Sequence, residues 1–441
     1  MSVQDERAAR GITEIDAALI RSAHPADAAA RLEGLPAARS WRYLAALPAA
    51  RRARIFAHLP ASTQAALARF IPPPALAGIM SHMDADDRAD LFNLLSPDEQ
   101  RRLMHHLAAE DRDDISRLEA YAEETAAAIM TSDYATLGSA MTAREAIPEL
   151  RRTAPDKETI YRSCILDEDG RLVGSVRLHT LVLADDETPI AHLMEPAPVS
   201  VTTATDREEV ARLIARYDIP AIAVVDEKGR LCGIVTHDDA TDAMQAETTG
   251  DFQKISTVLP FAQTVREAGI GVLYARRIVW LALLVFGNLF SGAGIAYFEE
   301  IILACVSLVF FLPLLIDSSG NAGSQSATLM VRALAVGDVT LADWRSLILR
   351  ELAVAAPLGA TMAVVVFPLG AARGGLDVAL AAGTTMFLVV AVGSLVGMSL
   401  PFLLSRLKLD PATASGPLVT TISDAVGVLV HFSIASLFLA L

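Results

Sequence analysis

The sequence predicts a multidomain membrane protein, in which an acidic soluble part precedes an all-helical membrane domain. The chain has 441 residues and a mean hydropathy of +0.40, yet 20% of its residues are charged. Residues 1–265 hold 28 Lys and Arg against 42 Asp and Glu, and long apolar segments follow. A soluble part joined to a membrane part explains both values. The acidic balance excludes nucleic acid as a partner, because phosphate binding needs basic surface, and it suits divalent cations.

Residues 1–127 are predicted to form an α-helical superhelix. An apolar residue recurs every twelve positions, at Leu35, Leu47, Leu59, Ile71, Met83, Leu95 and Leu107. Proline directly follows four of these residues, so we expect each unit to hold a short helix, a turn begun by proline and another short helix.

Asp86 and Asp90 lie four residues apart on one predicted helical face of this domain. Like charges at this spacing are mildly unfavourable unless a cation bridges them. A solvated acidic face is the alternative.

Residues 128–190 and 191–250 form an internal duplication. The segment Ile165–Val176 matches Val224–Val235, and each is typical of a strand, an Asp/Gly turn and a second strand. With a helix start before each segment, the sequence predicts two βαββα units, with Met130 and Met194 near their starts.

These α/β units resemble paired CBS domains, a family that often binds adenine nucleotides. The resemblance implies that a Thr or Ser followed three residues later by Asp, after the last strand, holds a ribose. The second unit has Thr236 and Asp239 in this pattern, whereas the first has Thr180 in place of the acid. We therefore expect at most one intact site for ATP or a related nucleotide, with a purely structural pair as the alternative.

Residues 251–276 are predicted to form a helix that connects the pair to the membrane. Acidic residues crowd the stretch just before it. Its place directly before the first apolar segment suits a mechanical link.

Five apolar segments predict a five-helix transmembrane domain over residues 277–441. They cover approximately 278–298, 301–331, 348–372, 378–404 and 416–441. The second segment is too long for one straight span and has a polar middle that contains Pro313, Gly320 and Gly323. We expect a broken helix that lines a water-filled path. Close helix packing is the alternative explanation for the glycines.

The distribution of Lys and Arg predicts the orientation, because these residues concentrate on the cytoplasmic side. If residues 1–265 are cytoplasmic, the inner side carries Arg266, Arg276, Arg277, Arg332, Arg345, Arg350, Arg406 and Lys408, and the outer side carries Arg373 alone. We expect a multi-pass protein of the bacterial inner or plasma membrane, in contact with lipid. Five spans put its N-terminus in the cytoplasm and its C-terminus outside. The scattered cysteines Cys164, Cys232 and Cys305 fit a reducing cytosol.

Asp424 is the one formal charge in the last apolar segment. An ionised carboxylate near a bilayer centre costs about 2.5 kcal/mol or more, so such groups face partners, water or ions. The segment has no Lys or Arg, so a transported cation is the expected counter-charge. A packing role, with the carboxyl protonated or bonded to Thr420 or Ser423, is the alternative. The other intramembrane acid, Asp317, is expected closer to the inner surface.

The order of these parts resembles the MgtE family of magnesium channels over almost the whole chain. Two membrane motifs carry the resemblance: the run that begins Gly320-Asn-Ala-Gly-Ser-Gln325, and the segment from Asp410 to Asp424. The resemblance implies a homodimer with its pore at the dimer interface and Mg²⁺ conduction past Asp424. It also implies closure when Mg²⁺ binds acidic residues between the cytosolic domains.

The resemblance assigns a role to individual residues. Around the pore it places Asp424, Thr420, Asn321 and Gly320. The regulatory acids map to Asp86, Asp90, Asp206, Asp218, Asp239, Asp242, Glu247 and Asp251. One family acid falls on Gly250, which is expected to weaken that cytosolic site.

The chemistry of Mg²⁺ agrees with this assignment, because the ion keeps several waters and needs only one or two carboxylates. The sequence has no Cys or His cluster that would select zinc or copper. Two other functions stay open: a carrier or exchanger of divalent cations such as Mg²⁺ and Co²⁺, and a membrane-anchored CBS sensor without transport. An enzyme is not expected, because the sequence contains no Ser/His/Asp set, phosphate-binding loop or catalytic metal triad.

Overall fold

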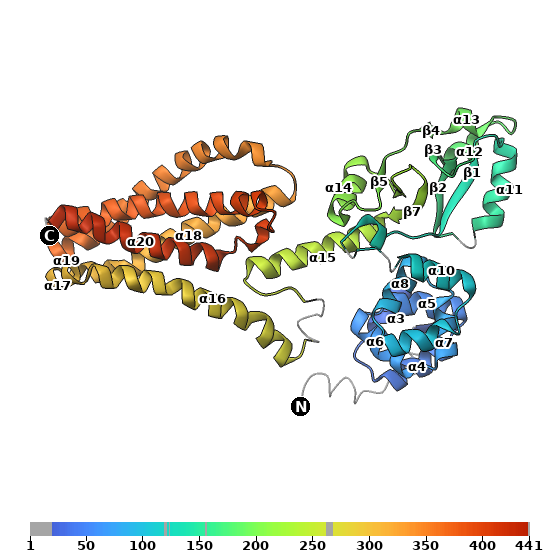
Figure 1. Ribbon diagram of the computed structural model, residues 1–441, viewed down its shortest axis with the longest axis horizontal. Coiled ribbons are helices and arrows are strands. Elements are labelled where there is room, and N and C mark those ends of the chain that lie inside the picture. Colours follow the sequence, from blue (N-terminus) through green and yellow to red (C-terminus); the bar gives the residue numbers. More distant parts are fainter. Residues whose placement is uncertain (1–19, 119–120, 123, 155–156, 262–267, 440–441) are drawn as a thin grey trace. The chain divides into compact units, whose positions relative to one another are not determined.

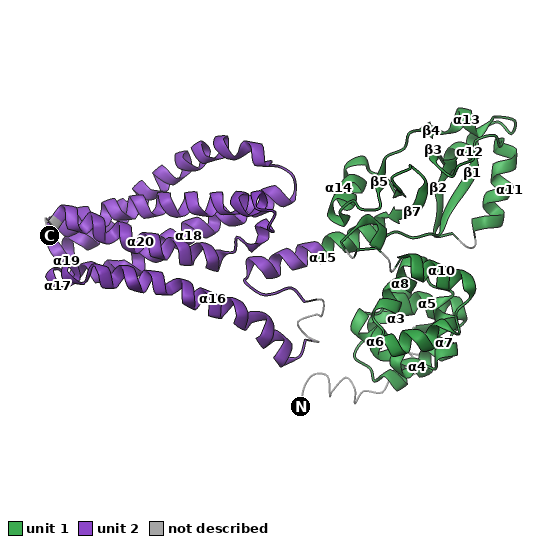
Figure 2. Ribbon diagram, in the orientation of Figure 1, with its two compact units in different colours: residues 1–246 green, residues 247–441 purple. Residues whose placement is uncertain are grey.

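The structure is a computed structural model that describes residues 20–118, 121–122, 124–154, 157–261 and 268–439. The chain divides into two compact units, Met1–Ala246 and Glu247–Leu441 (Figures 1 and 2). The first unit contains the helical repeat and the α/β pair. The second unit contains the apolar helices.

Short helices follow one another through the predicted superhelix, of which residues 1–19 lie outside the described part. They are α3 (Pro25–Leu32), α4 (Ala37–Ala45), α5 (Ala49–Ala57), α6 (Ala61–Phe70), α7 (Pro73–Met80), α8 (Ala85–Asn93), α9 (Pro97–Met104) and α10 (Ala109–Leu118). The residues that recur every twelve positions from Leu47 to Leu107 are buried in one core, and Leu35 packs against it.

The contents of each repeat differ from the prediction. Pro36, Pro48, Pro60 and Pro72 are the N-cap residues of α4 to α7, a position where proline's missing N–H costs nothing. Each twelve-residue unit therefore holds one helix of eight to ten residues, because the cap and the turn leave no room for a second.

The duplicated segments fold as two βαββα units, as predicted. The first comprises β1 (Tyr134–Gly138), α11 (Ala143–Thr153), β2 (Thr159–Leu166), β3 (Leu172–Arg177) and α12 (Leu178–Leu183). After α13 (Ile190–Leu193) and β4 (Glu195–Pro196), the second comprises β5 (Ser200–Thr202), α14 (Arg207–Tyr217), β6 (Ala221–Val225), β7 (Leu231–Thr236) and α15 (His237–Ile255). The sheets have the orders β1-β2-β3-β4 and β5-β6-β7.

In each βαββα unit, the short segment that precedes the first strand packs on the other βαββα unit. Met130, expected at the start of the first unit, is buried in the core of the second, and Thr131 pairs with Ile234 there. Met194 packs against the core of the first unit, next to β4. Each unit therefore depends on a piece of chain that lies close to the other in sequence.

The predicted connecting helix over 251–276 is not one helix. Helix α15 runs on from the second CBS unit to Ile255, and Thr257 then takes a φ of 54°. Pro260 follows, and the residue before a proline is disfavoured in helical geometry. Residues 262–267 lie outside the described part, and α16 begins at Ile270.

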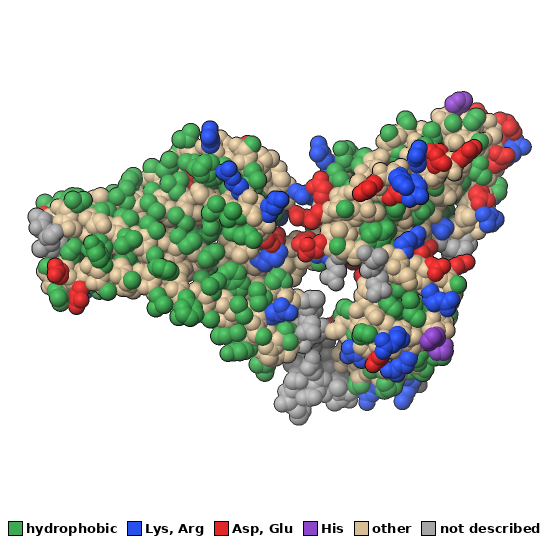
Figure 3. Space-filling view, viewed as in Figure 1, with side chains coloured by type: hydrophobic (Ala, Val, Ile, Leu, Met, Phe, Trp, Pro, Cys, Tyr) green, Lys and Arg blue, Asp and Glu red, His purple; other side chains and the backbone are tan. Residues whose placement is uncertain are grey.

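The second unit consists of helices. They are α16 (Ile270–Tyr297), α17 (Glu299–Ala304), α18 (Ser307–Ala335), α19 (Trp344–Arg406) and α20 (Gly416–Leu439). Within the described residues, three helical stretches are long and apolar enough to cross a membrane: Ile270–Tyr297, Leu341–Arg406 and Gly416–Phe438. Apolar side chains cover much of the visible face of this second unit (Figure 3).

Helix α19 is two antiparallel halves, as Figure 1 shows. Its 63 residues are interrupted at Gly375, whose φ of 79° favours glycine. Val366 from the first half and Val378 and Met386 from the second share one buried cluster. Each half is about 45 Å long at 1.5 Å per residue, enough to cross the hydrocarbon core.

Helix α18 is continuous, which corrects the expectation of a broken helix. Pro313, Gly320 and Gly323 all lie inside it. A Cβ placed on Gly397 of α19 would lie 1.9 Å from the carbonyl oxygen of Gly323. The glycines thus permit close helix contact, which was the alternative explanation.

Candidate functional site

Asp424 lies on α20, about two turns after that helix begins at Gly416, and its side chain is half-buried. It makes no hydrogen bond or ion pair with any residue that the structure describes. The buried hydroxyl oxygen of Ser423 also has no partner in the described part of the chain. The hydrogen bonds to Thr420 or Ser423, which are one form of the packing alternative, are therefore not found among the described residues.

Asp317 and Asn321 lie beside Asp424 on the neighbouring helix. Helices α18 and α20 run antiparallel, with Ile316 opposite Gly427 and Ser324 bonded to the carbonyl of Gly416. Asp317 is therefore level with Asp424 and repels it electrostatically, rather than closer to the inner surface as expected. The Asn321 amide donates to the Asp317 carboxylate at 3.0 Å.

The other two predicted pore residues form the contact between these helices. A Cβ added to buried Gly320 would lie 2.8 Å from the side chain of Thr420. The Thr420 hydroxyl donates to the Pro417 carbonyl at 2.9 Å, and its lone pairs stay available to a hydrated ion. Gly320 thus sets the spacing that lets Thr420 and Asp424 share a face with Asn321.

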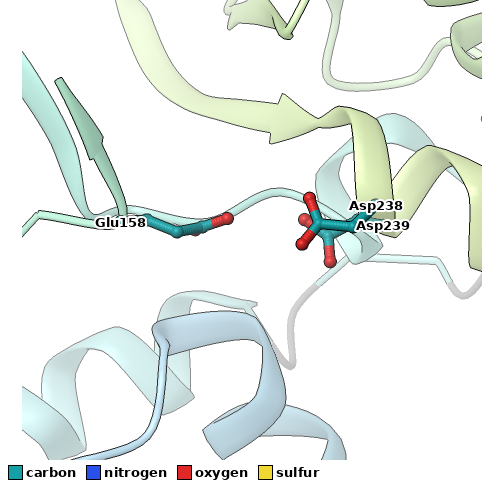
Figure 4. Close-up of side chains that lie close together, drawn as sticks. All are labelled: Glu158, Asp238 and Asp239. Atoms are coloured by element: carbon teal, nitrogen blue, oxygen red, sulfur yellow. The ribbon is translucent and has the colours of Figure 1, made fainter. Parts of the chain in front are cut away.

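A second group of acids gathers in the first unit. Carboxylate oxygens of Glu158, Asp238 and Asp239 lie within 4.8 Å of one another, and Figure 4 shows the side chain of Glu158 directed at the two aspartates. Asp86 on α8 lies near the same place, close enough for the charge of Asp239 to repel its own. Helix α8, the start of α15 and the loop before β2 therefore converge on one acidic cluster, which we call the α8–α15 cluster.

Burial and mutual repulsion disfavour ionisation in the α8–α15 cluster. Burial, followed by the charge of Asp239, raises the pKa of Asp86 well above its usual range and that of Glu158 to about 8. Burial and the neighbouring Asp84 raise the pKa of Asp87 to about 7. One oxygen of Asp86 and one of Glu158 are buried without a hydrogen-bond partner among the described residues. A hydrated Mg²⁺ would satisfy these oxygens and neutralise the cluster.

The remaining predicted regulatory acids do not join the α8–α15 cluster. Asp90 is one turn beyond Asp86 on α8, and Asp242 is exposed three residues after Asp239. Asp206 caps α14 by accepting from the Glu208 amide at 2.8 Å. Asp218 ends that helix with a left-handed φ of 49°.

Glu247 and Asp251 belong to the second unit, where Asp251 lies beside the cation of Lys254. Lys254 lies 3.7 Å from Asp251 and forms an ion pair with Asp410, the residue before the short turn that leads to α20. Burial raises the pKa of Asp251, and Asp410 and Glu247 add to this effect.

Thr236 and Asp239, the residues predicted to hold a ribose, bond to each other within the α8–α15 cluster. The Thr236 hydroxyl donates to the Asp239 carboxylate, which belongs to the α8–α15 cluster. A separate cleft of about 580 Å³ lies between the two CBS units. Its polar lining includes Arg162, Arg177 and His179. Asp218 also lines the cleft, and Arg162 and Arg177 each pair with Glu195 at 2.8 Å. The cleft still offers cationic side chains for a nucleotide phosphate, which the acids around Asp239 do not.

Sequence reasoning missed Glu158, the level of Asp317 and the Lys254–Asp410 pair. Each depends on contacts between residues far apart in the chain. The one sequence signal for Glu158 was an acid placed directly before a buried strand.

The molecule combines a helical repeat, an α/β pair with clustered carboxylates, and apolar helices, one of which carries the unpaired carboxylate of Asp424. These are features of the class of cation transporters that carry a CBS pair. Family models match three parts: the divalent cation transporter family MgtE over 312–434, the MgtE intracellular N domain over 23–124, and CBS domains over 126–187 and 190–246. The chain belongs to the MgtE family, which confirms the predicted resemblance and places it among transporters rather than enzymes.

Relatives cover most of the chain. The magnesium transporter MgtE of Thermus thermophilus is 42% identical over 73% of this chain and 72% of its own length. The protein of that name from Enterococcus faecalis is 35% identical over 72% and 70%. A crystal structure of the cytosolic domain of the Mg²⁺ channel MgtE in complex with ATP has a TM-score of 0.50 and 38% identity, over 54% of this chain and 98% of that one.

Proposed function

We propose that this chain is a Mg²⁺-selective channel that takes up magnesium across the bacterial inner membrane and closes when cytosolic Mg²⁺ is high. The observation that carries the proposal is the carboxylate of Asp424, half-buried on an apolar helix and unpaired in the described part of the chain. The names of the relatives, magnesium transporters and a Mg²⁺ channel, support the choice of ion.

The pore forms between two copies of the chain, around the face that carries Asp424, Asp317 and Asn321. Two such faces supply carboxylates and amide oxygens to a dication that keeps part of its water shell. The Thr420 hydroxyl, held by its bond to Pro417, adds an outer contact. Asp317 makes this face more acidic than the sequence prediction assumed.

The membrane domain crosses five times, with α16, α18, the two halves of α19, and α20 as spans. The N-terminal part is cytosolic, as the intracellular N-domain match supports, and the end of α20 faces outside. Helix α18 has a polar middle because it lines the pore.

The α8–α15 cluster senses cytosolic Mg²⁺. Without the ion, its carboxylates repel one another or take up protons; with it, α8 and the start of α15 are drawn together. If Mg²⁺ binds the compact state alone, it stabilises that state by RT ln(1 + [Mg²⁺]/Kd). This movement is proposed to close the pore through α15, which continues into the second unit.

Mg²⁺ uptake into proteoliposomes tests the proposal. Wild type and Asp338→Asn, an exposed acid outside the helices, are expected to take up Mg²⁺, whereas Asp424→Asn is not. All three proteins should elute alike in size-exclusion chromatography. Normal uptake by folded Asp424→Asn would overturn the pore assignment. Single-channel currents are expected; flux that strictly requires a counter-ion would point instead to a carrier.

We propose further that one ATP binds each chain at the cleft between the CBS units, in place of the site predicted at Thr236 and Asp239. Calorimetric titration of ATP should show one site that Arg177→Ala weakens and Asp239→Ala leaves intact. The reverse pattern would restore the predicted ribose site.

A further inference from the structure

A cavity of about 780 Å³ opens on the second unit, and its lining residues do not include Asp424, Asp317 or Asn321. Its wall is apolar along one side, with Val396, Leu400 and Leu403 from the second half of α19 and Ile422 from α20. Two residues at one end differ: Trp344, the first residue of α19, and Arg406, its last. Because α19 folds back on itself, both residues lie at the same end of the hairpin.

This end of the hairpin is the cytoplasmic one in the proposed orientation. Arg406 is exposed and makes no ion pair with any described residue. Trp344 is 40% exposed, and tryptophan is enriched where the bilayer meets water. The cavity therefore runs from a cationic, interfacial mouth into an apolar interior. A volume of this size is typical of a site for a small molecule.

The cavity lies on the opposite side of α20 from the pore face. Residues two apart on an α-helix point about 200° away from each other, so Ile422 in the cavity wall and Asp424 face opposite ways. If Asp424 faces the partner copy, as proposed above, the cavity faces the surrounding bilayer. The occupant with access to it is a membrane lipid, not the transported ion.

We propose that this cavity binds one anionic phospholipid of the inner leaflet. The headgroup phosphate pairs with the Arg406 guanidinium, a strong and directional contact, and an acyl chain lies along Leu400, Leu403 and Ile422. Basic pockets between helices on the cytoplasmic side recognise anionic headgroups in this way. The lipid would join the two ends of α19 to α20, the helix that carries Asp424.

Native mass spectrometry of the full-length protein in detergent tests this site. The probes are phosphatidylglycerol and phosphatidylcholine with identical acyl chains. Wild type should retain one phosphatidylglycerol per chain in preference to phosphatidylcholine. Arg406→Gln should weaken phosphatidylglycerol retention about five- to tenfold, the effect of losing one charged contact. Arg350→Gln removes an exposed cytoplasmic-side charge outside the cavity and should leave retention unchanged.

A second variant tests the apolar part of the cavity. Ser399, also in its wall, is replaced by Trp to fill the space that the acyl chain occupies, and retention of both lipids should fall. Equal retention of the two lipids by wild type, or unchanged retention by Arg406→Gln, would overturn the proposal. Disulfide-linked dimers of Ser399→Cys, in a background without the native cysteines, would also overturn it by showing that a second copy covers this face.

Discussion

Asp317 gives the proposed pore a second acid, which single-sequence reasoning left aside. It lies level with Asp424 because α18 and α20 are antiparallel, and Asn321 fixes its carboxylate. The sequence identified Asp424 from its isolation in an apolar run. It could not give the depth of Asp317, since that depends on how two helices align.

Asp317→Asn should therefore slow Mg²⁺ uptake without abolishing it. Loss of one nearby charge weakens the attraction that offsets ion dehydration, and a decrease of roughly tenfold is expected. Rates in proteoliposomes would measure it, with Asp377→Asn, an exposed acid beyond the Gly375 bend, as the matched control. A rate equal to wild type would remove Asp317 from the ion path.

The raised pKa values in the α8–α15 cluster make the free energy of unfolding fall as pH rises. The pKa values of Asp87 and Glu158, about 7 and about 8, exceed their ordinary values of 3.8 and 4.5. The folded state thus binds more protons than the unfolded chain between about pH 4 and about pH 8, and its stability falls as pH rises through this range.

Thermal melts of the soluble part in EDTA should therefore shift to lower temperature as pH rises from about 5 to about 8. Millimolar Mg²⁺ should restore the melting temperature most at the upper end, where fewer protons compete for the carboxylates. Glu158→Gln should flatten the pH dependence, while Glu168→Gln, in an exposed turn, should not. Melts that rise with pH in EDTA would contradict the cluster's electrostatics.

Among the elements, local patterns predicted the folds of single units well. The twelve-residue spacing located the buried residues of the helical repeat, because every unit presents the same apolar position to one core. The duplicated strand–turn–strand segments located both sheets. The sequence could not predict that Met130 packs in the core of the second βαββα unit and Met194 against that of the first. The local sequence does not determine which core a short preceding segment joins.

The end of α15 was also missed, because its anchor is 156 residues away in sequence. Lys254 pairs with Asp410, and Ile255 packs against the cluster of Val331, Ala412 and Ala414. At this junction, formed by the last turn of α15 and residues 410–414, Lys254 supplies positive charge between Asp251 and Asp410. The junction should consequently depend less on divalent cations than one built from acids alone.

Lys254→Gln should make the junction dependent on Mg²⁺. Without the ammonium group, Asp251 and Asp410 repel each other until a dication lies between them. Hydrogen exchange in the last turn of α15 should accelerate in EDTA and slow again in Mg²⁺, whereas Lys228→Gln, in an exposed turn, should behave like wild type. Exchange that is unchanged by Lys254→Gln would show that apolar packing alone holds the helix end.

In the whole molecule, the proposed sensing and the proposed conduction use the same chemistry in two places. Both groups of carboxylates lack a protein counter-charge within the described residues, and both suit a hydrated dication. The two groups differ in the contacts that hold their carboxylates in place. The pore acids are held by helix packing inside one unit. The α8–α15 cluster instead joins a helical repeat to an α/β unit, so Mg²⁺ there can change how two domains associate.

Removing the sensor should leave a channel that conducts but does not close. Glu158→Gln combined with Asp239→Asn removes two carboxylates of the α8–α15 cluster and relieves the repulsion that Mg²⁺ otherwise neutralises. Patch recordings with millimolar Mg²⁺ on the cytosolic side should show currents in the double variant and little current in wild type. Adding Asp424→Asn should abolish those currents, because gating and conduction reside in separate residues. A double variant that closes like wild type would place the sensor elsewhere, while the pore assignment would stand on the uptake experiment alone.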